Sequence, residues 1–291
     1  MFDMTLIKKI LTTIKHCQDL YFSLIILKNN LNLLRLFEEG LRTKLLIHPD
    51  AMRLVSANLY LIDQNMRNSD EAVRIFRDLL LKHGNPERAL RRMNELGVLA
   101  AFIPEFKPIV AMMQFNMYHS FTVDEHTIQT IGHLAAIERG ELVEELPVAS
   151  AILGSGLNRK VIYIALLLHD IGKGQIEDHS VLGAKIARDV APRLGLNPRE
   201  SENVEWLVRH HLLMSDMAQK RDIADPRTVR DFAKAVQSVK RLDLLTVLTV
   251  CDISGVGPGV WNNWKAVLIR ALYRQTKKAL ETGLEDLNRE N

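Results

Sequence analysis

The feature that most constrains the fold of this chain is an apolar run that ends in two polar residues. Residues 161–168 read Val-Ile-Tyr-Ile-Ala-Leu-Leu-Leu, and His169-Asp170 follow directly. A helix that is apolar on every side has to be buried, so the other elements must pack around it. The polar residues at its C-terminal end then lie in the interior of the protein. A carboxylate there is costly unless a metal ion or a salt bridge compensates it.

From about Leu31 onward, the remaining sequence predicts helix after helix. Apolar residues recur three and four positions apart, and strand-like alternation is almost absent. A capping residue or a proline indicates a helix start in three segments: His48-Pro49-Asp50, Ser69-Asp70-Glu71 and Asn85-Pro86-Glu87. The third of these helices should end at Gly97. We therefore expect an all-α fold, built as a helical bundle.

Two further expectations concern the region before the apolar helix. Thr122-Val-Asp-Glu125 has the pattern of a capping box, which places His126 just inside the next helix. We expect a loop between that helix and the apolar one, over residues 138–158, because this stretch holds several residues that break helices: Gly140, Pro147, Gly154 and Gly156.

Composition sets modest limits on function. With 291 residues, 47% of them hydrophobic, the chain can bury a real core. A formal net charge of +3 is nearly balanced and predicts no general affinity for nucleic acid or membranes. Cys17 and Cys251 support neither a disulfide framework nor a cysteine metal site, so we expect reducing cytoplasm. The apolar residues 20–27 are too few to span a bilayer and predict a terminal helix or a poorly specified leader.

Histidines are concentrated in the middle of the chain. Of the ten, seven lie between His119 and His211. Imidazole and carboxylate together suit Mn, Fe, Zn or Mg, which points to metal-assisted hydrolysis of a phosphate ester. The candidate ligands from the residues alone are His169, Asp170, His179, Asp252 and either or both of His210 and His211. His119 and His133 are expected to be packing or surface residues.

Lys173 lies between Gly172 and Gly174, just after the His-Asp pair. Two interpretations stay open: a point charge that meets a phosphate oxygen, or a solvated lysine in a turn. Further on, Gly183 lies one helical turn after His179, where a missing side chain permits close helix packing.

These residues, in this order, resemble the HD superfamily of metal-dependent phosphohydrolases. The pattern there is His, then His-Asp, then Asp, with extra histidines in binuclear members. The resemblance implies His126, His169, Asp170 and Asp252 as metal ligands, with His179, His210 and His211 as the binuclear extension. It further implies one or two divalent ions, Mn or Mg with Fe as a further candidate. Asp170, which would bridge two ions, and Lys173 are the expected catalytic residues.

Three segments point to one family within this superfamily: residues 85–97, residues 112–126 and residues 169–183. They are similar to the family of bifunctional PII uridylyltransferase/uridylyl-removing enzymes. The similarity covers roughly residues 31–280, which implies a helical linker region over 31–110 and an HD domain over 111–280. Residues 1–30 stay unassigned, and residues 281–291 form a tail. The activity implied is hydrolysis of the uridylyl-tyrosine phosphodiester of the PII signalling protein, which gives UMP.

The chain also departs from this family's pattern. Family members begin with a nucleotidyltransferase domain that carries a Gly-Ser motif and an Asp-x-Asp pair, and they end with two ACT domains. The Gly154-Ser155 of this chain is not followed by an Asp-x-Asp pair. We therefore expect a fragment, a split-gene product with the missing domains encoded separately, or a decayed remnant, without uridylyl transfer of its own.

Two alternative functions stay open. Another HD phosphohydrolase could act on a nucleotide, a cyclic dinucleotide or an alarmone, although the additional motifs of the last two classes are absent. A helical module that binds protein or RNA could instead use Arg88, Arg91 and Arg92 as a basic helix edge. The interleaved Glu87 and Glu95 favour an ordinary solvated face over nucleic-acid binding.

Overall fold

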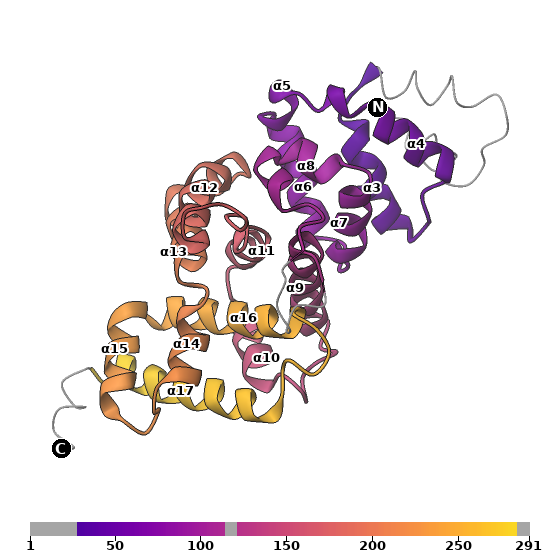
Figure 1. Cartoon of the computed structure of the whole chain (residues 1–291). Coiled ribbons are helices and arrows are strands. Elements are labelled where there is room, and N and C mark those ends of the chain that lie inside the picture. Colours follow the sequence, from indigo (N-terminus) through magenta and orange to yellow (C-terminus); the bar gives the residue numbers. More distant parts are fainter. Residues whose placement is uncertain (1–27, 114–120, 284–291) are drawn as a thin grey trace.

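The computed structural model describes residues 28–113 and 121–283. Every regular element in these ranges is a helix, so the all-α expectation is confirmed (Figure 1). His119, most of the unassigned residues 1–30 and most of the tail at 281–291 lie outside the described residues. Among those that are described, no helix is long and apolar enough to cross a membrane.

The first group of helices precedes residue 110, at the end of the molecule where α3 and α4 lie in Figure 1. In chain order these elements are α3 (Asn32–Thr43), α4 (Pro49–Ala57), the 3-10 turn η1 (Leu59–Leu61), α5 (Gln64–Arg67), α6 (Asp70–Leu81), α7 (Pro86–Glu95), α8 (Val98–Phe102) and the 3-10 turn η2 (Pro104–Ile109).

The second group begins with a long helix that packs on both α7 and the later helices. Its elements are α9 (Val123–Glu138), α10 (Pro147–Gly154), α11 (Arg159–Leu168), α12 (His179–Arg193), α13 (Pro198–His210), α14 (Leu213–Lys220), α15 (Pro226–Val236), α16 (Val239–Gly255) and α17 (Asn263–Thr282).

The apolar run forms the central helix α11, as predicted. All residues of 161–168 are buried. Asn158 begins the helix, because its side chain accepts a hydrogen bond from the Val161 backbone N–H (3.2 Å). Helices α6, α9, α12, α13 and α16 pack around α11. One continuous hydrophobic core, from Leu33 to Tyr273, joins both groups of helices around it.

The three predicted helix starts are confirmed. Pro49 and Pro86 occupy first-turn positions of α4 and α7. The Ser69 hydroxyl accepts a hydrogen bond from the backbone N–H of Ala72 at the start of α6 (3.1 Å). Gly97 follows α7 with φ of 82°, a backbone conformation that a residue with a side chain rarely adopts.

Two expectations are wrong. Thr122 is the residue before α9, but its side chain makes no capping hydrogen bond. Glu125 forms an ion pair with Arg91 of α7 instead of closing a capping box, so a tertiary contact outcompetes the local one. The predicted loop over residues 138–158 contains α10. Pro147 begins this helix favourably, and Ala149 and Ile152, three residues apart, bury its inner face.

We predict that Leu166→Ala lowers the free energy of unfolding by about 2–5 kcal/mol, because it leaves a cavity beside a fully buried side chain. Urea unfolding followed by circular dichroism measures this. The control is Leu46→Ala, at a side chain that is 75% exposed, which should change the free energy by less than about 0.5 kcal/mol. An equal effect of the two substitutions would contradict the central position of α11.

Candidate metal centre

Five helices bring the predicted polar residues to one place. His126 lies in the second turn of α9, and Asp252 lies near the end of α16. His169 is the residue that ends α11, with Asp170 directly after it. His179 is the first residue of α12, and His211 is the residue that ends α13. Each side chain therefore comes from a separate helix or from a helix end.

The first cluster of possible ligand atoms contains His126, His169 and Asp170. The two imidazole Nε2 atoms lie 3.3 Å apart. Asp170 Oδ2 lies 3.4 Å from Nε2 of His169 and 3.6 Å from Nε2 of His126. Asp252 adjoins this cluster, since its Oδ1 lies 3.0 Å from Nε2 of His126 and 3.5 Å from Nε2 of His169. We call these four residues the first group.

The second group contains Asp170, His179 and His211. Asp170 Oδ1 lies 3.6 Å from Nε2 of His211 and 4.0 Å from Nε2 of His179. One carboxylate thus turns Oδ2 toward the first group and Oδ1 toward the second. Asp170 is therefore the residue that the two groups share.

Hydrogen bonds fix the tautomers of two of these histidines. Nδ1 of His169 lies 2.7 Å from the Leu166 carbonyl oxygen, and Nδ1 of His211 lies 2.7 Å from the Val208 carbonyl oxygen. A carbonyl oxygen only accepts, so Nδ1 carries the hydrogen and donates it. In the neutral ring, Nε2 then presents its lone pair to the centre, as a metal ligand requires.

The donor atoms fit a divalent cation. Within the described part of the chain, the buried Nε2 atoms of His179 and His211 have no hydrogen-bond partner. Buried polar atoms are nearly always satisfied, so such atoms turned toward a carboxylate indicate a missing ligand. Imidazole nitrogens together with carboxylate oxygens suit Mn or Fe, and less well Mg, which prefers oxygen.

Burial and neighbouring charges set the ionisation of the centre. Burial alone would raise the pKa of Asp170, but His169 and Lys173 outweigh it and hold that pKa well below its usual value. The pKa of Asp252 is likewise lowered by His169 and His126, against the effect of burial. Burial lowers the pKa of His211, which keeps its ring neutral. Burial alone would lower the pKa of His169, but Asp170 and Asp252 raise it to about 10. The ion-free centre thus favours a proton on this ring, and a bound cation would replace that proton.

Lys173 forms an ion pair with the buried carboxylate of the centre. Its Nζ is 2.7 Å from Asp170 Oδ2. The side chains of His179, Asp252 and Lys173 are 27%, 17% and 16% exposed, whereas that of Asp170 is 2% exposed. The centre is therefore not fully closed to solvent. The contact with Asp170 means that Lys173 is more than a solvated turn lysine.

A close backbone approach places His179 next to Asp170. A Cβ atom added to Gly172 would lie 2.4 Å from the His179 carbonyl oxygen and 2.7 Å from the Gly183 backbone nitrogen. Both distances are too short for a real contact. Gly183 is the close-packing glycine that the sequence indicates, and Gly172 is its counterpart in the turn after Asp170.

The other histidines of the region lie elsewhere. The His210 ring is half-buried and stacks on Trp206, with ring centroids 4.8 Å apart, and it belongs to neither group. His133 is half-buried on α9, where burial lowers its pKa. Since neighbouring residues on a helix point about 100° apart, only one residue of the pair at 210–211 faces the centre.

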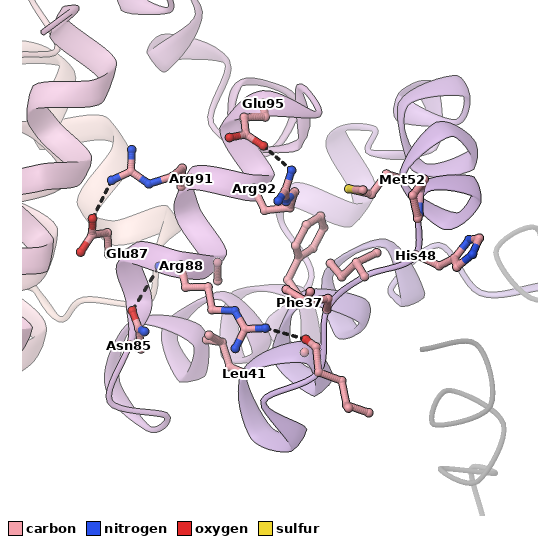
Figure 2. A pocket seen from close by; sticks show the side chains of 16 residues that line it. Phe37, Leu41, His48, Met52, Asn85, Glu87, Arg88, Arg91, Arg92 and Glu95 are labelled. Atoms are coloured by element: carbon pink, nitrogen blue, oxygen red, sulfur yellow. Dashed lines mark hydrogen bonds and ion pairs between the residues drawn. The ribbon is translucent and has the colours of Figure 1, made fainter. Parts of the chain in front are cut away.

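A separate hollow of about 800 Å³ lies between α3, α4 and α7 (Figure 2). Among the described residues that line it there is no predicted metal ligand. Its three arginines are already engaged: Arg88 donates to the Leu45 carbonyl oxygen (2.7 Å), Arg91 pairs with Glu87 (2.6 Å) and Arg92 pairs with Glu95 (2.6 Å). Two of the three charges are thus paired with glutamates and the third arginine is held by a carbonyl oxygen, which weakens the case for the basic edge that the RNA-binding alternative needs.

Both groups of helices are similar to known proteins. Residues 123–248 match the HD domain, and residues 23–102 match the third domain of uridylyltransferase GlnD. Over 264 residues, 91% of this chain, it is 78% identical to the bifunctional uridylyltransferase/uridylyl-removing enzyme of Ruegeria pomeroyi. An enzyme of the same name from Cereibacter sphaeroides is 74% identical over 265 residues, again 91% of this chain.

The chain corresponds to one section of the enzymes in the uridylyltransferase/uridylyl-removing family. The resemblance seen in the sequence is thereby confirmed. The chain spans 29% and 28% of the length of these two enzymes. Within this section, the HD match includes all the candidate ligands except Asp252, which lies just beyond its end. The division of the chain at residue 110 and the roles of individual ligands stay predictions.

We predict that Gly172→Ala in this HD domain lowers the free energy of unfolding by about 1–3 kcal/mol, because the new methyl group overlaps rigid backbone atoms of α12. Gly154→Ala is the matched control: a Cβ there meets nothing within 4 Å, and the position is helical. It should match or exceed the wild-type free energy, by at most about 1 kcal/mol. Urea unfolding compares the two. If Gly172→Ala is neutral, α12 does not pack as described.

Proposed function

We propose that this chain hydrolyses a phosphodiester with the help of a divalent metal ion, and that its substrate is the uridylylated PII protein, from which UMP is released. The observation that carries the proposal is the buried Asp170 carboxylate, whose two oxygens face two separate groups of histidines. An arrangement of this kind supports two ions that share one ligand, as two-metal phosphodiester hydrolysis uses them.

In this proposal, His126, His169, Asp170 and Asp252 would hold one ion, and Asp170, His179 and His211 would hold the other. Bound there, a divalent ion supplies Lewis acidity to the phosphodiester and makes water a nucleophile near neutral pH. His210, stacked on Trp206, has no part in either set. The mixed nitrogen and oxygen donors make Mn²⁺ the ion to test first, followed by Fe²⁺ and Mg²⁺.

The chain's own residues attract the ions and orient the substrate. Asp170 and Asp252 attract positive charge, and a bound cation would take the place of the proton that these carboxylates favour on His169. Lys173 Nζ lies beside the Asp170 carboxylate, and its side chain is 16% exposed. There it can turn from the carboxylate to a non-bridging phosphate oxygen and stabilise the charge that develops during hydrolysis.

The relatives support the choice of substrate. Their name includes removal of a uridylyl group, and the matched section contains an HD domain. Those names do not mention PII or UMP. That this chain acts on PII and releases UMP from it is part of the proposal. A nucleotide or another small phosphodiester as the substrate of the HD domain is the second candidate.

We predict that the pure chain with Mn²⁺ releases UMP from uridylylated PII, and that His169→Ala lowers the rate by at least about 100-fold, because it removes a ligand rather than an outer contact. Chromatography of the nucleotide and the mass of PII measure the two products. His210→Ala is the control and should keep most of the activity. If PII stays modified while a panel of small phosphodiesters is cleaved, the second candidate is correct.

A second prediction concerns metal binding itself. Calorimetric titration with Mn²⁺ should show two ions in the wild-type chain. His126→Ala should remove one and His179→Ala the other, while His210→Ala should keep both. Retention of both ions in His211→Ala, together with a loss in His210→Ala, would show that the opposite histidine of the pair is the ligand.

A further inference from the structure

Helix α7, in the section that matches the GlnD third domain, lies antiparallel against α9, the helix that carries His126. The start of α7 meets the middle of α9: a Cβ added to Gly132 would lie only 2.2 Å from Glu87 Oε2. The end of α7 meets the start of α9, where Asn94 contacts Asp124. The missing side chain at Gly132 thus lets α7 run close along α9.

A polar stripe on α7 holds the first turn of α9. Glu87, Arg91 and Asn94 follow the spacing i, i+4, i+7 and so share one face of α7. Arg91 joins Glu87 (2.6 Å) to Glu125 of α9. Asn94 Nδ2 donates to Asp124 Oδ2 (2.8 Å).

Asp124 is itself buried. Its exposed fraction is 4%. Its Oδ2 accepts the hydrogen bond from Asn94 of α7. A buried carboxylate of this kind anchors its helix firmly, because moving away from its donor would leave a buried acceptor without that partner.

These two anchored carboxylates directly precede His126. The His126 ring must stay near His169 Nε2 (3.3 Å) and Asp252 Oδ1 (3.0 Å) for the first group to exist. The backbone of His126 donates to the Thr122 carbonyl oxygen (2.8 Å), so its place depends on the first turn of α9. A rotation of that turn moves the ring directly.

We propose that Arg91 and Asn94 are positioning residues for the metal centre: through Glu125 and Asp124 they fix the turn of α9 that aims His126 at the first group. The proposal rests on the proposed function, since it takes the first group as a metal site. It makes the third-domain helix α7 part of the support of the HD centre. In that role α7 acts selectively, because the second group contains no residue of α9.

The test uses the double variant Arg91→Met/Asn94→Leu, which removes both contacts and keeps side-chain size. Mn²⁺ titration of the full chain measures both ions, assigned by their loss in His126→Ala and His179→Ala. We expect the dissociation constant of the His126-dependent ion to rise about 10-fold or more, as for loss of outer contacts at other metal sites. The His179-dependent ion should keep its affinity within about 3-fold, since none of its ligands, Asp170, His179 and His211, lies on α9.

The matched control is Arg92→Met, on the same helix, whose guanidinium pairs only with the neighbouring Glu95 in the contacts described. It should leave both affinities unchanged. Single variants at Arg91 and Asn94 serve where the double variant does not fold, and Arg91→Lys should restore much of the affinity. Equal weakening of both ions, or no weakening of the His126-dependent ion, overturns the positioning role. A wild-type chain that binds no Mn²⁺ overturns the proposed function instead.

Discussion

The structure depends on the burial of one carboxylate. Asp170 is 2% exposed at the end of a helix that has no polar face, so water cannot solvate its charge. Compensation comes from Lys173 on one side and from imidazoles of four helices around it. Forming such a buried set of charges stabilises the fold little, but removing one partner destabilises it strongly, because a buried charge is left uncompensated. The packing of these helices therefore depends on the same residues that form the ligand set.

Two histidines at helix ends are oriented by the same kind of hydrogen bond. His169 and His211 each end a helix, and each donates from Nδ1 to the carbonyl oxygen three residues earlier. The last carbonyls of a helix have no partner within it, so the imidazole satisfies one of them while its other nitrogen faces the centre. A helix end therefore supplies the second contact that a histidine ligand needs, without a further side chain.

Features that depend on neighbouring residues could be predicted from the sequence, whereas contacts between residues far apart in the chain could not. The buried helix α11 and the starts at Pro49, Ser69 and Pro86 depend on neighbouring residues alone, and the sequence shows them. The capping box failed because Glu125 is engaged by an arginine 34 residues away. The alternatives at 210 and 211 could not be separated, because the direction of each side chain depends on how α13 is rotated against α12. Helix α10 was missed because the glycines at its end and on either side of it indicate a loop, whereas its short buried face, Ala149 and Ile152, depends on packing.

The two matched sections of the chain share one core. The GlnD third-domain match ends at residue 102 and the HD match begins at residue 123. Between and across these limits, the apolar cluster continues from Phe102 through Ile109 to Ile131 without interruption. Family limits drawn on sequence therefore do not separate independent hydrophobic cores here. Because α7 packs on the helix that carries His126, the third-domain section contributes to the geometry of the centre, although none of its residues belongs to either group of ligands.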